Sequence, residues 1–161
     1  MAKTQALLLP KTCAHVDIES YLGVWYEIAR FPSFFERDGC YNVQARYSLV
    51  PGAPPGQIQI ENSCMYEGAP HSIKGTATVV STAKLQVSFL PFVPYWLSHG
   101  NYWILDTDHT SFSLVGDPER KHLWILSRKP HMLRTTYDRL VQSARADGFD
   151  VSRLQIVLQA S

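Results

Sequence analysis

The sequence has few cysteines, no long hydrophobic run and no excess of charge of either sign. Three cysteines in 161 residues are too few for a disulfide scaffold, and they lack CxxC or Cys/His metal-ligand spacing. Fifteen basic and fourteen acidic side chains give a net charge of +1, which argues against nucleic acid as a partner. No apolar run approaches the roughly 20 residues of a membrane-spanning helix.

Motifs of catalysis and of metal binding are missing as well. The six histidines are scattered without paired spacing, and we interpret them as solvated residues of turns and loops. Neither a GxSxG motif nor a phosphate-binding glycine loop is present. The sequence therefore predicts no metal ion, no cofactor and no catalytic residue.

What the sequence does contain is apolar residues along its whole length. They make up 45% of the chain, which is typical of a globular protein of one domain. We therefore expect residues 1–161 to form a single domain, in which residues 1–14 are a flexible N-terminal segment.

Alternation of apolar and polar residues predicts β-strands. The signal is strongest over 41–49, and a Pro- and Gly-rich turn over 51–56 joins this strand to the next as a hairpin. The predicted strands cover 24–31, 41–49, 57–64, 72–80, 84–89, 101–106, 111–116 and 121–128. Eight consecutive antiparallel strands form either a barrel or a sandwich, and periodicity alone does not distinguish the two.

One segment has the periodicity of a helix. Apolar residues recur at helical spacing from Leu133 to Ala144, and Gly148 stands where a helix would end. We expect this α-helix to pack on the outside of the sheet. The alternation over 151–159 predicts a short final strand.

Three motifs in order resemble the signatures of the lipocalin family. The first is Gly23-x-Trp25-Tyr26-Glu27, the second surrounds Asp106 and Asp108, and the third is LWILSR, which ends at Arg128. The resemblance covers residues 15–158 and is closest to the bacterial outer-membrane lipocalins and their plant temperature-induced and apolipoprotein D relatives. His109 departs from the aromatic residue that lipocalins often have in the second signature.

The resemblance implies an all-β, eight-stranded, antiparallel up-and-down barrel, closed at one end and open at the other. It also implies that Trp25 lies across the closed end with the Arg128 guanidinium over its indole ring. We assign a structural role to all the signature residues. These residues are Gly23, Trp25, Tyr26, Asp106, Asp108 and Arg128.

In such a barrel, alternate residues of each strand face the interior. An ordinary packed core would show the same pattern, but the resemblance favours a hollow. The predicted ligand-binding residues are Val43, Ala45, Tyr47, Ile58, Ile60, Asn62, Ile73, Val87, Phe89, Tyr102 and Trp124, together with Phe34 and Phe35 in a lid loop over 32–39. Parity also directs Leu85, Ile104 and Leu126 inward.

The apolar stretch over 89–97 joins two strands at the open end. Its aromatic residues cannot all be hidden easily, and exposed apolar patches mark interaction sites. We therefore expect Phe92, Tyr95 and Trp96 to contact a membrane surface or the second subunit of a homodimer.

Cys40 and Cys64 are brought near each other by the hairpin that turns at Gly52. Strand parity alone directs their side chains to opposite faces, so a disulfide requires a bulge or a Cys40 that precedes the regular strand. Bacterial members of the resembled family often carry this pair, so the resemblance implies the disulfide and, with it, an oxidising compartment.

These features predict a carrier or scavenger of small amphipathic lipids, with fatty acids and lysophospholipids as the expected ligands. The resemblance implies the bacterial cell envelope, in the periplasm or outer membrane, when a leader has been removed, and otherwise a soluble cytoplasmic protein. The alternative is an enzyme of the isomerase or de-epoxidase type acting inside the barrel. Such an enzyme would have to rely on Glu27, Tyr47 or Tyr102.

Overall fold

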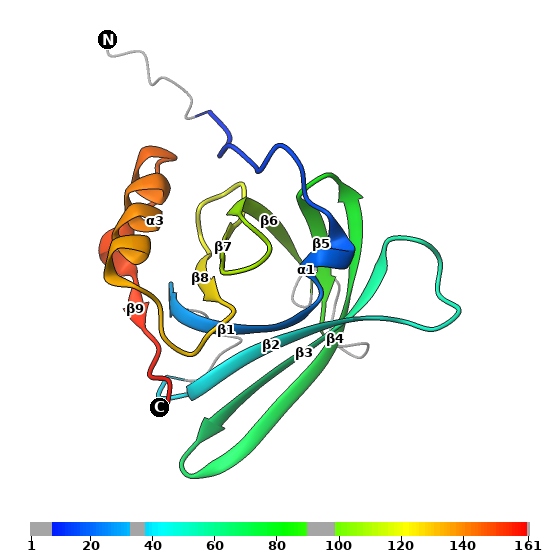
Figure 1. Ribbon diagram of the computed structural model, residues 1–161, viewed down its shortest axis with the longest axis horizontal. Helices are drawn as coiled ribbons and strands as arrows, with labels where there is room; N and C mark the ends of the chain where they lie inside the picture. The colour runs from blue at the N-terminus through cyan, green and yellow to red at the C-terminus, as the bar shows by residue number, and fades with distance from the viewer. Residues whose placement is uncertain (1–7, 33–37, 90–98, 161) are drawn as a thin grey trace.

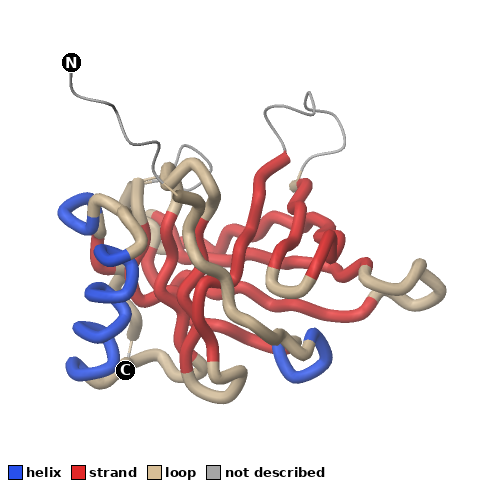
Figure 2. The backbone as a smooth tube through the Cα atoms, turned by 90° about the horizontal axis from the view of Figure 1, so that it is seen from above, coloured by secondary structure: helices blue, strands red, loops and turns tan. Residues whose placement is uncertain are grey.

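The computed structural model describes residues 8–32, 38–89 and 99–160, and it shows a closed β-barrel with one helix outside (Figures 1 and 2). Each barrel strand pairs with the next in the chain, and β1 pairs with both β2 and β8, which closes the circle. The prediction of an eight-stranded barrel is confirmed, and the sandwich is excluded. The barrel strands are β1 (Gly23–Arg30), β2 (Tyr41–Leu49), β3 (Gln57–Tyr66), β4 (Ala69–Ser81), β5 (Lys84–Ser88), β6 (His99–Thr107), β7 (Phe112–Gly116) and β8 (Leu123–Ser127).

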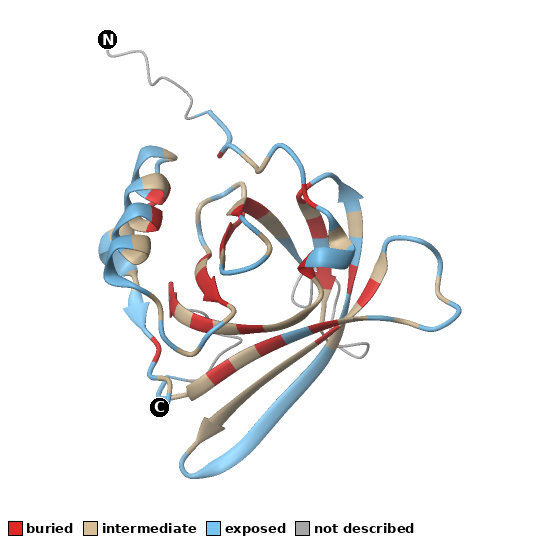
Figure 3. Cartoon of the chain, in the orientation of Figure 1, coloured by how far each residue is buried: buried red, intermediate tan, exposed pale blue. Residues whose placement is uncertain are grey.

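Apolar residues on the inner face fix the register of the strands. In the hairpin of β2 and β3, Tyr47 lies opposite Ile60 and Ala45 lies opposite Asn62. Figure 3 shows how buried positions alternate with more exposed ones along β2. A shift of one residue would turn this whole set toward solvent, so burial selects the register.

The helix α3 (Arg134–Ala146) packs against the outside of the barrel, as predicted. It ends where Gly148 adopts a φ of 90°, with Phe149 N–H donating to the Ala144 carbonyl at 3.1 Å and Gly148 N–H to that of Arg145 at 3.0 Å. These two bonds are the Schellman pattern that a glycine after a helix predicts. Leu133 does not join the buried face, because it is the N-cap residue and is 75% exposed.

A second hydrophobic core lies between α3 and the barrel. Leu140 and Ala144 of the helix are fully buried against Leu123 and Ile125 of β8. Both faces of β8 are therefore apolar, since one lines the interior and the other is covered by the helix. Among the described helices, none is long and apolar enough to cross a membrane.

The closed end of the barrel carries a short helix, α1 (Ile18–Tyr21), that the periodicity did not predict. Its N-cap is Asp17, whose side chain accepts a hydrogen bond from Glu19 N at 3.2 Å. Four residues are too few to produce a periodic signal. The helix places Tyr21 inside the barrel end, where it is 1% exposed.

The prediction of a strand over 151–159 is wrong for most of that segment. The structure has a 3₁₀ turn, η1 (Val151–Arg153), followed by β9 (Gln155–Ile156), which pairs with β1 outside the barrel. The remaining tail bridges β1 and β2, because the Gln159 side-chain amide donates to the carbonyls of Glu27 at 2.8 Å and Val43 at 2.9 Å. The Gln159 side chain thus holds the tail against both β1 and β2 without regular strand pairing.

Candidate functional site

The open half of the barrel contains a cavity of about 90 Å³. Since one water molecule needs roughly 10 to 15 Å³ on this scale, the hollow would hold several. The last residues of β1, β3, β5 and β7 all lie at this end, because the strands run alternately up and down. The described residues of the wall are Glu27, Ala45, Tyr47, Ile60, Asn62, Val87, Phe89, Gly100, Asn101, Tyr102, His122, Trp124 and Leu126.

Most of the predicted ligand-binding residues come together in this wall. They are Ala45, Tyr47, Ile60, Asn62, Val87, Phe89, Tyr102 and Trp124. Val43 and Ile58 are buried, but they are not among the described residues of the wall. Ile58 packs near the closed end together with Trp25, so the barrel is solid at its base and hollow above it.

Ile73 is a third predicted ligand-binding residue that is not among the described wall residues. It lies opposite Asn62 in the hairpin of β3 and β4, but it is 36% exposed and is not among the described wall residues. The first six residues of β4 are all exposed, as Figure 3 shows. Strand parity directs alternate residues inward along the whole of β4. The end of this long hairpin, however, extends beyond the part of the barrel that surrounds the cavity.

Two further groups of predicted contact residues lie outside the described residues. They are Phe34 and Phe35 of the lid loop, and Phe92, Tyr95 and Trp96 of the apolar stretch. Their roles remain predictions.

Three tyrosine hydroxyls form a hydrogen-bonded chain below the cavity. The Tyr102 hydroxyl lies 2.9 Å from that of Tyr21 and accepts a hydrogen bond from Tyr47 at 3.0 Å, while Ser113 Oγ lies 2.8 Å from the Tyr21 hydroxyl. Burial raises the pKa of Tyr21 to about 12 and that of Tyr102 well above its ordinary value. At neutral pH both hydroxyls keep their protons, so Tyr102 is a poor general base.

Glu27, one of the polar residues of the wall, forms a buried ion pair with Arg30. Arg30 Nε lies 3.1 Å from Glu27 Oε1, and the two side chains are 4% and 8% exposed. A β-bulge in β1 between Glu27 and Ala29 changes which residues face inward, so that Ala29 packs under α3. The Glu27 carboxylate therefore lies against a guanidinium inside the protein.

Sequence reasoning missed His122, which it interpreted as a solvated histidine. Its ring lines the cavity, with Nδ1 3.1 Å from Asp117 Oδ2 and the ring plane 7° from that of Trp124. Its position two residues before Trp124 on the inner face of β8 was the available signal. Gly100 and Asn101 were also missed; both lie next to Tyr102 at the start of β6.

The closed end is held together by Trp25 and Arg128, as the signatures implied. The Arg128 guanidinium lies 3.8 Å from the centre of the Trp25 ring and donates to the carbonyls of Val24 and Ser20, both at 2.9 Å. It also donates to the His109 carbonyl at 3.1 Å. Gly23 has a φ of 102°, and a Cβ there would lie 3.3 Å from Arg128 Nη1, so this position favours glycine.

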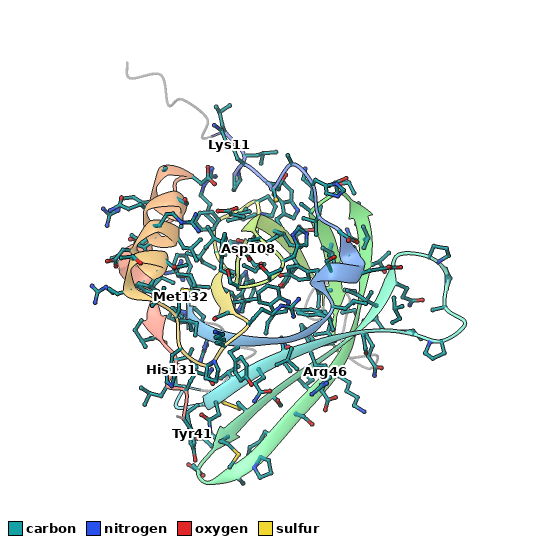
Figure 4. All side chains as sticks on the ribbon, in the orientation of Figure 1. Lys11, Tyr41, Arg46, Asp108, His131 and Met132 are labelled. Carbon is teal, nitrogen blue, oxygen red and sulfur yellow. A yellow bond between two sulfur atoms is a disulfide. The ribbon has the colours of Figure 1, made fainter. Side chains whose placement is uncertain are left out.

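The second signature forms the turn between β6 and β7, where Asp108 is labelled in Figure 4. Asp108 Oδ1 accepts hydrogen bonds from the backbone N–H groups of Ser111 at 2.8 Å and Phe112 at 3.0 Å. Partial burial acts against ionisation, but the Ser111 hydroxyl and these N–H groups lower the pKa of Asp108 to about 2. Asp106 instead lies 3.3 Å from Arg139 of α3, whereas Tyr26 is half-buried on β1.

Cys40 and Cys64 form a disulfide, with Cα atoms 5.8 Å apart. Cys40 lies just before β2, and the register shifts between Tyr41 and Gln44. Asn42 in this irregular stretch has a φ of 53°. Strand parity alone would direct Cys40 and Cys64 to opposite faces of the sheet. The bulge and the position of Cys40 before β2 allow the two side chains to meet.

The comparisons with known proteins agree with this geometry. A family model described as a lipocalin-like domain matches residues 16–159. Temperature-induced lipocalin-1 of Arabidopsis thaliana is 39% identical over 147 residues, which cover 86% of this chain and 77% of the relative. Apolipoprotein D of Mus musculus is 32% identical over 163 residues, covering 94% of this chain and 82% of the relative.

Among solved structures, insecticyanin from the tobacco hornworm Manduca sexta superposes with a TM-score of 0.73. The match covers 94% of this chain and 85% of that one, at 19% sequence identity. At this identity the likeness concerns the fold alone. Within the part of the chain that the structure describes, no group of three His, Cys, Asp or Glu side chains lies together as metal ligands would.

Proposed function

Because the chain belongs to the lipocalin family, whose members bind small hydrophobic ligands, we propose that it carries or scavenges fatty acids or lysophospholipids in its barrel cavity. The observation that supports this proposal most strongly is the hollow in the open half of the barrel. Its wall is mainly aliphatic and aromatic, with a few polar side chains near the mouth. Walls of this composition suit a ligand with one apolar and one polar end.

The energetics of an acyl chain support this choice of ligand. Each buried methylene contributes about 0.8 kcal/mol, so the gain grows with the length of chain that enters the hollow, up to the order of 10 kcal/mol for complete burial of a long chain. Loss of free motion on association costs roughly 4 kcal/mol or more. The balance corresponds to a micromolar or tighter complex, with little discrimination between chains of similar length.

Filling the cavity tests the proposal directly. Val87 lies in the wall and its neighbour Gln86 is exposed on the same strand, so Val87→Trp and Gln86→Trp form a matched pair. Val87→Trp is expected to weaken palmitic acid binding at least tenfold, the equivalent of about two buried methylenes. Calorimetric titration gives both dissociation constants. Equal affinity in the two variants, or no binding by the unaltered protein, would contradict the proposal.

We further propose that the protein works at the cell envelope and exchanges its ligand with a membrane. Support comes from the apolar stretch over 89–97, which follows β5 in the sequence, and from the disulfide, since such bonds persist in oxidising compartments. Phe92, Tyr95 and Trp96 supply the aromatic side chains that favour a membrane interface.

Liposome flotation tests this membrane contact. The double substitution Phe92→Ser and Trp96→Ser is expected to reduce association with phosphatidylglycerol vesicles severalfold, because it removes two large apolar side chains. Leu49→Ser is the control, since Leu49 is 59% exposed at the end of β2, at the closed end of the barrel. Unchanged flotation of the double variant, combined with its conversion from a dimer to a monomer on size exclusion, would instead assign these residues to a homodimer interface.

A further inference from the structure

A stack of side chains at the cavity mouth ends in an Asp–His pair. The His122 ring lies 5.6 Å from the Trp124 ring, and Trp124 lies 6.2 Å from Tyr102, in both cases with stacked planes. Asp117 accepts from the backbone N–H of His122 at 3.0 Å and contacts its Nδ1 at 3.1 Å. The imidazole is therefore held in one orientation by a carboxylate and by an aromatic ring.

This pair occupies the turn between β7 and β8, which lies at the open end. The His122 side chain is 28% exposed, whereas that of Asp117 is 9% exposed. His122 also belongs to the cavity wall. The imidazole thus lies between the apolar hollow and solvent, where the polar end of an amphipathic ligand would rest.

Among the described residues near the imidazole, the other carboxylates are paired with cations, and Asp117 is the carboxylate that contacts the ring. On β1, Glu27 is paired with Arg30, and in the turn Glu119 lies 2.9 Å from Lys121. The Arg120 guanidinium bonds to the carbonyl of Asp147 at 2.6 Å and to that of Leu8.

Two phenols of the wall and the Asp117 carboxylate also lie near the ring. The phenols of Tyr47 and Tyr102, which share the wall, are bonded to each other. Burial acts to raise the pKa of Asp117, but the hydrogen bonds from His122 outweigh it and lower the pKa. Asp117 is therefore a carboxylate throughout the range in which histidine changes its charge, from about pH 8 to 5.

We propose that Asp117 and His122 form the subsite for an anionic lipid headgroup, which binds more tightly once the imidazole is protonated. The inference rests on the proposed carrier function. With a neutral imidazole the pair has a net charge of −1 and repels an anion, whereas the protonated pair has a net charge of zero and a positive ring in the cavity wall. Acidification therefore favours an anionic ligand and leaves an uncharged one unaffected.

Two lipids with the same acyl chain distinguish the contribution of the headgroup to affinity from that of the chain in the cavity. Lysophosphatidylglycerol keeps its negative phosphodiester between pH 5.5 and 8, and a monoacylglycerol is uncharged throughout. We expect lysophosphatidylglycerol to bind about fivefold more tightly at pH 5.5 than at pH 8, and the monoacylglycerol to bind equally at both. Titration below the critical micelle concentration, followed by tryptophan fluorescence, measures both profiles.

Substitutions then assign the effect to the pair. His122→Gln is expected to abolish the pH dependence of lysophosphatidylglycerol binding while monoacylglycerol affinity is kept. Asp117→Asn should tighten lysophosphatidylglycerol binding at pH 8, because it removes the fixed negative charge. His131→Gln is the matched control, since His131 is exposed between β8 and α3, and it should retain the full profile.

The outcomes distinguish this inference from the function on which it rests. Failure of both lipids to bind at either pH would refute the carrier function and the headgroup subsite together. Binding of both lipids with the same pH response, or an unchanged profile in His122→Gln, would overturn the subsite and leave the carrier function intact.

Discussion

Replacement of Trp25 by alanine is expected to lower the free energy of unfolding by about 4 kcal/mol, within the range for truncation of a buried aromatic residue. Trp25 is 0% exposed, and its Nε1 donates to the Tyr21 carbonyl at 2.9 Å. Its ring lies 5.0 Å from that of Tyr21 and carries the Arg128 guanidinium on one face. The substitution therefore leaves a large void and removes the surface on which the guanidinium rests. Urea denaturation, with the disulfide intact, measures the loss.

The same variant tests whether the base of the barrel contributes to ligand binding as well as to stability. Trp25 is not among the described residues of the cavity wall, so the folded fraction of Trp25→Ala should bind palmitic acid with unchanged affinity.

Arg128→Lys should lower the free energy of unfolding by about 2 kcal/mol, because an ammonium cannot reproduce the planar donors that meet three carbonyls. Arg139→Lys is the control and should cost under about 1 kcal/mol, since Arg139 forms an exposed ion pair. Equal costs for the two arginines would contradict the assignment.

Alkaline pH is expected to destabilise the protein strongly. The pKa of Tyr21 is raised to about 12 from an ordinary value of 10.0, so between these values the unfolded chain loses a proton that the folded protein retains. The stabilisation is complete below pH 10 and is lost as the pH rises toward 12, because unfolding is then coupled to ionisation. Two pKa units correspond to about 3 kcal/mol, and Tyr102 acts in the same direction.

Unfolding free energies at pH 9, 10, 11 and 11.5 measure this dependence. A Cys13→Ser background removes the free thiol, which would otherwise attack the disulfide at high pH. Tyr21→Phe should cost about 1 kcal/mol at pH 9, through loss of the hydrogen bonds to Ser113 and Tyr102, but it should flatten the alkaline decline. A decline as steep in Tyr21→Phe as in the parent would show that other groups govern alkaline unfolding.

The sequence alone predicted most of what depends on local pattern. Strand periodicity located all eight barrel strands, because burial of one face requires apolar residues at alternate positions. Helical spacing and Gly148 located α3 and its end, since a left-handed residue terminates a helix at low cost. Both signals are contained within a few neighbouring residues.

The choice between barrel and sandwich was not available from periodicity, since both bury one face of each strand. The lipocalin signatures indicated the barrel, and the pairing of β1 with both β2 and β8 confirms it. The signatures also indicated the contact of Trp25 with Arg128, two residues that are far apart in the sequence.

Only the tertiary structure decided which inward-facing residues meet a hollow and which polar groups join them. The bulge in β1 brings Arg30 to Glu27, and the bulge near Tyr41 allows Cys40 to reach Cys64. The length of the β3–β4 hairpin leaves Ile73 exposed, while the turn before β8 places His122 in the wall. A period of two fixes a side chain's face within one strand, but bulges, strand length and turn geometry determine what that face meets. Those depend on packing between segments far apart in the chain, so a local pattern such as the position of His122 two residues before Trp124 gives the face but not the cavity that the face meets.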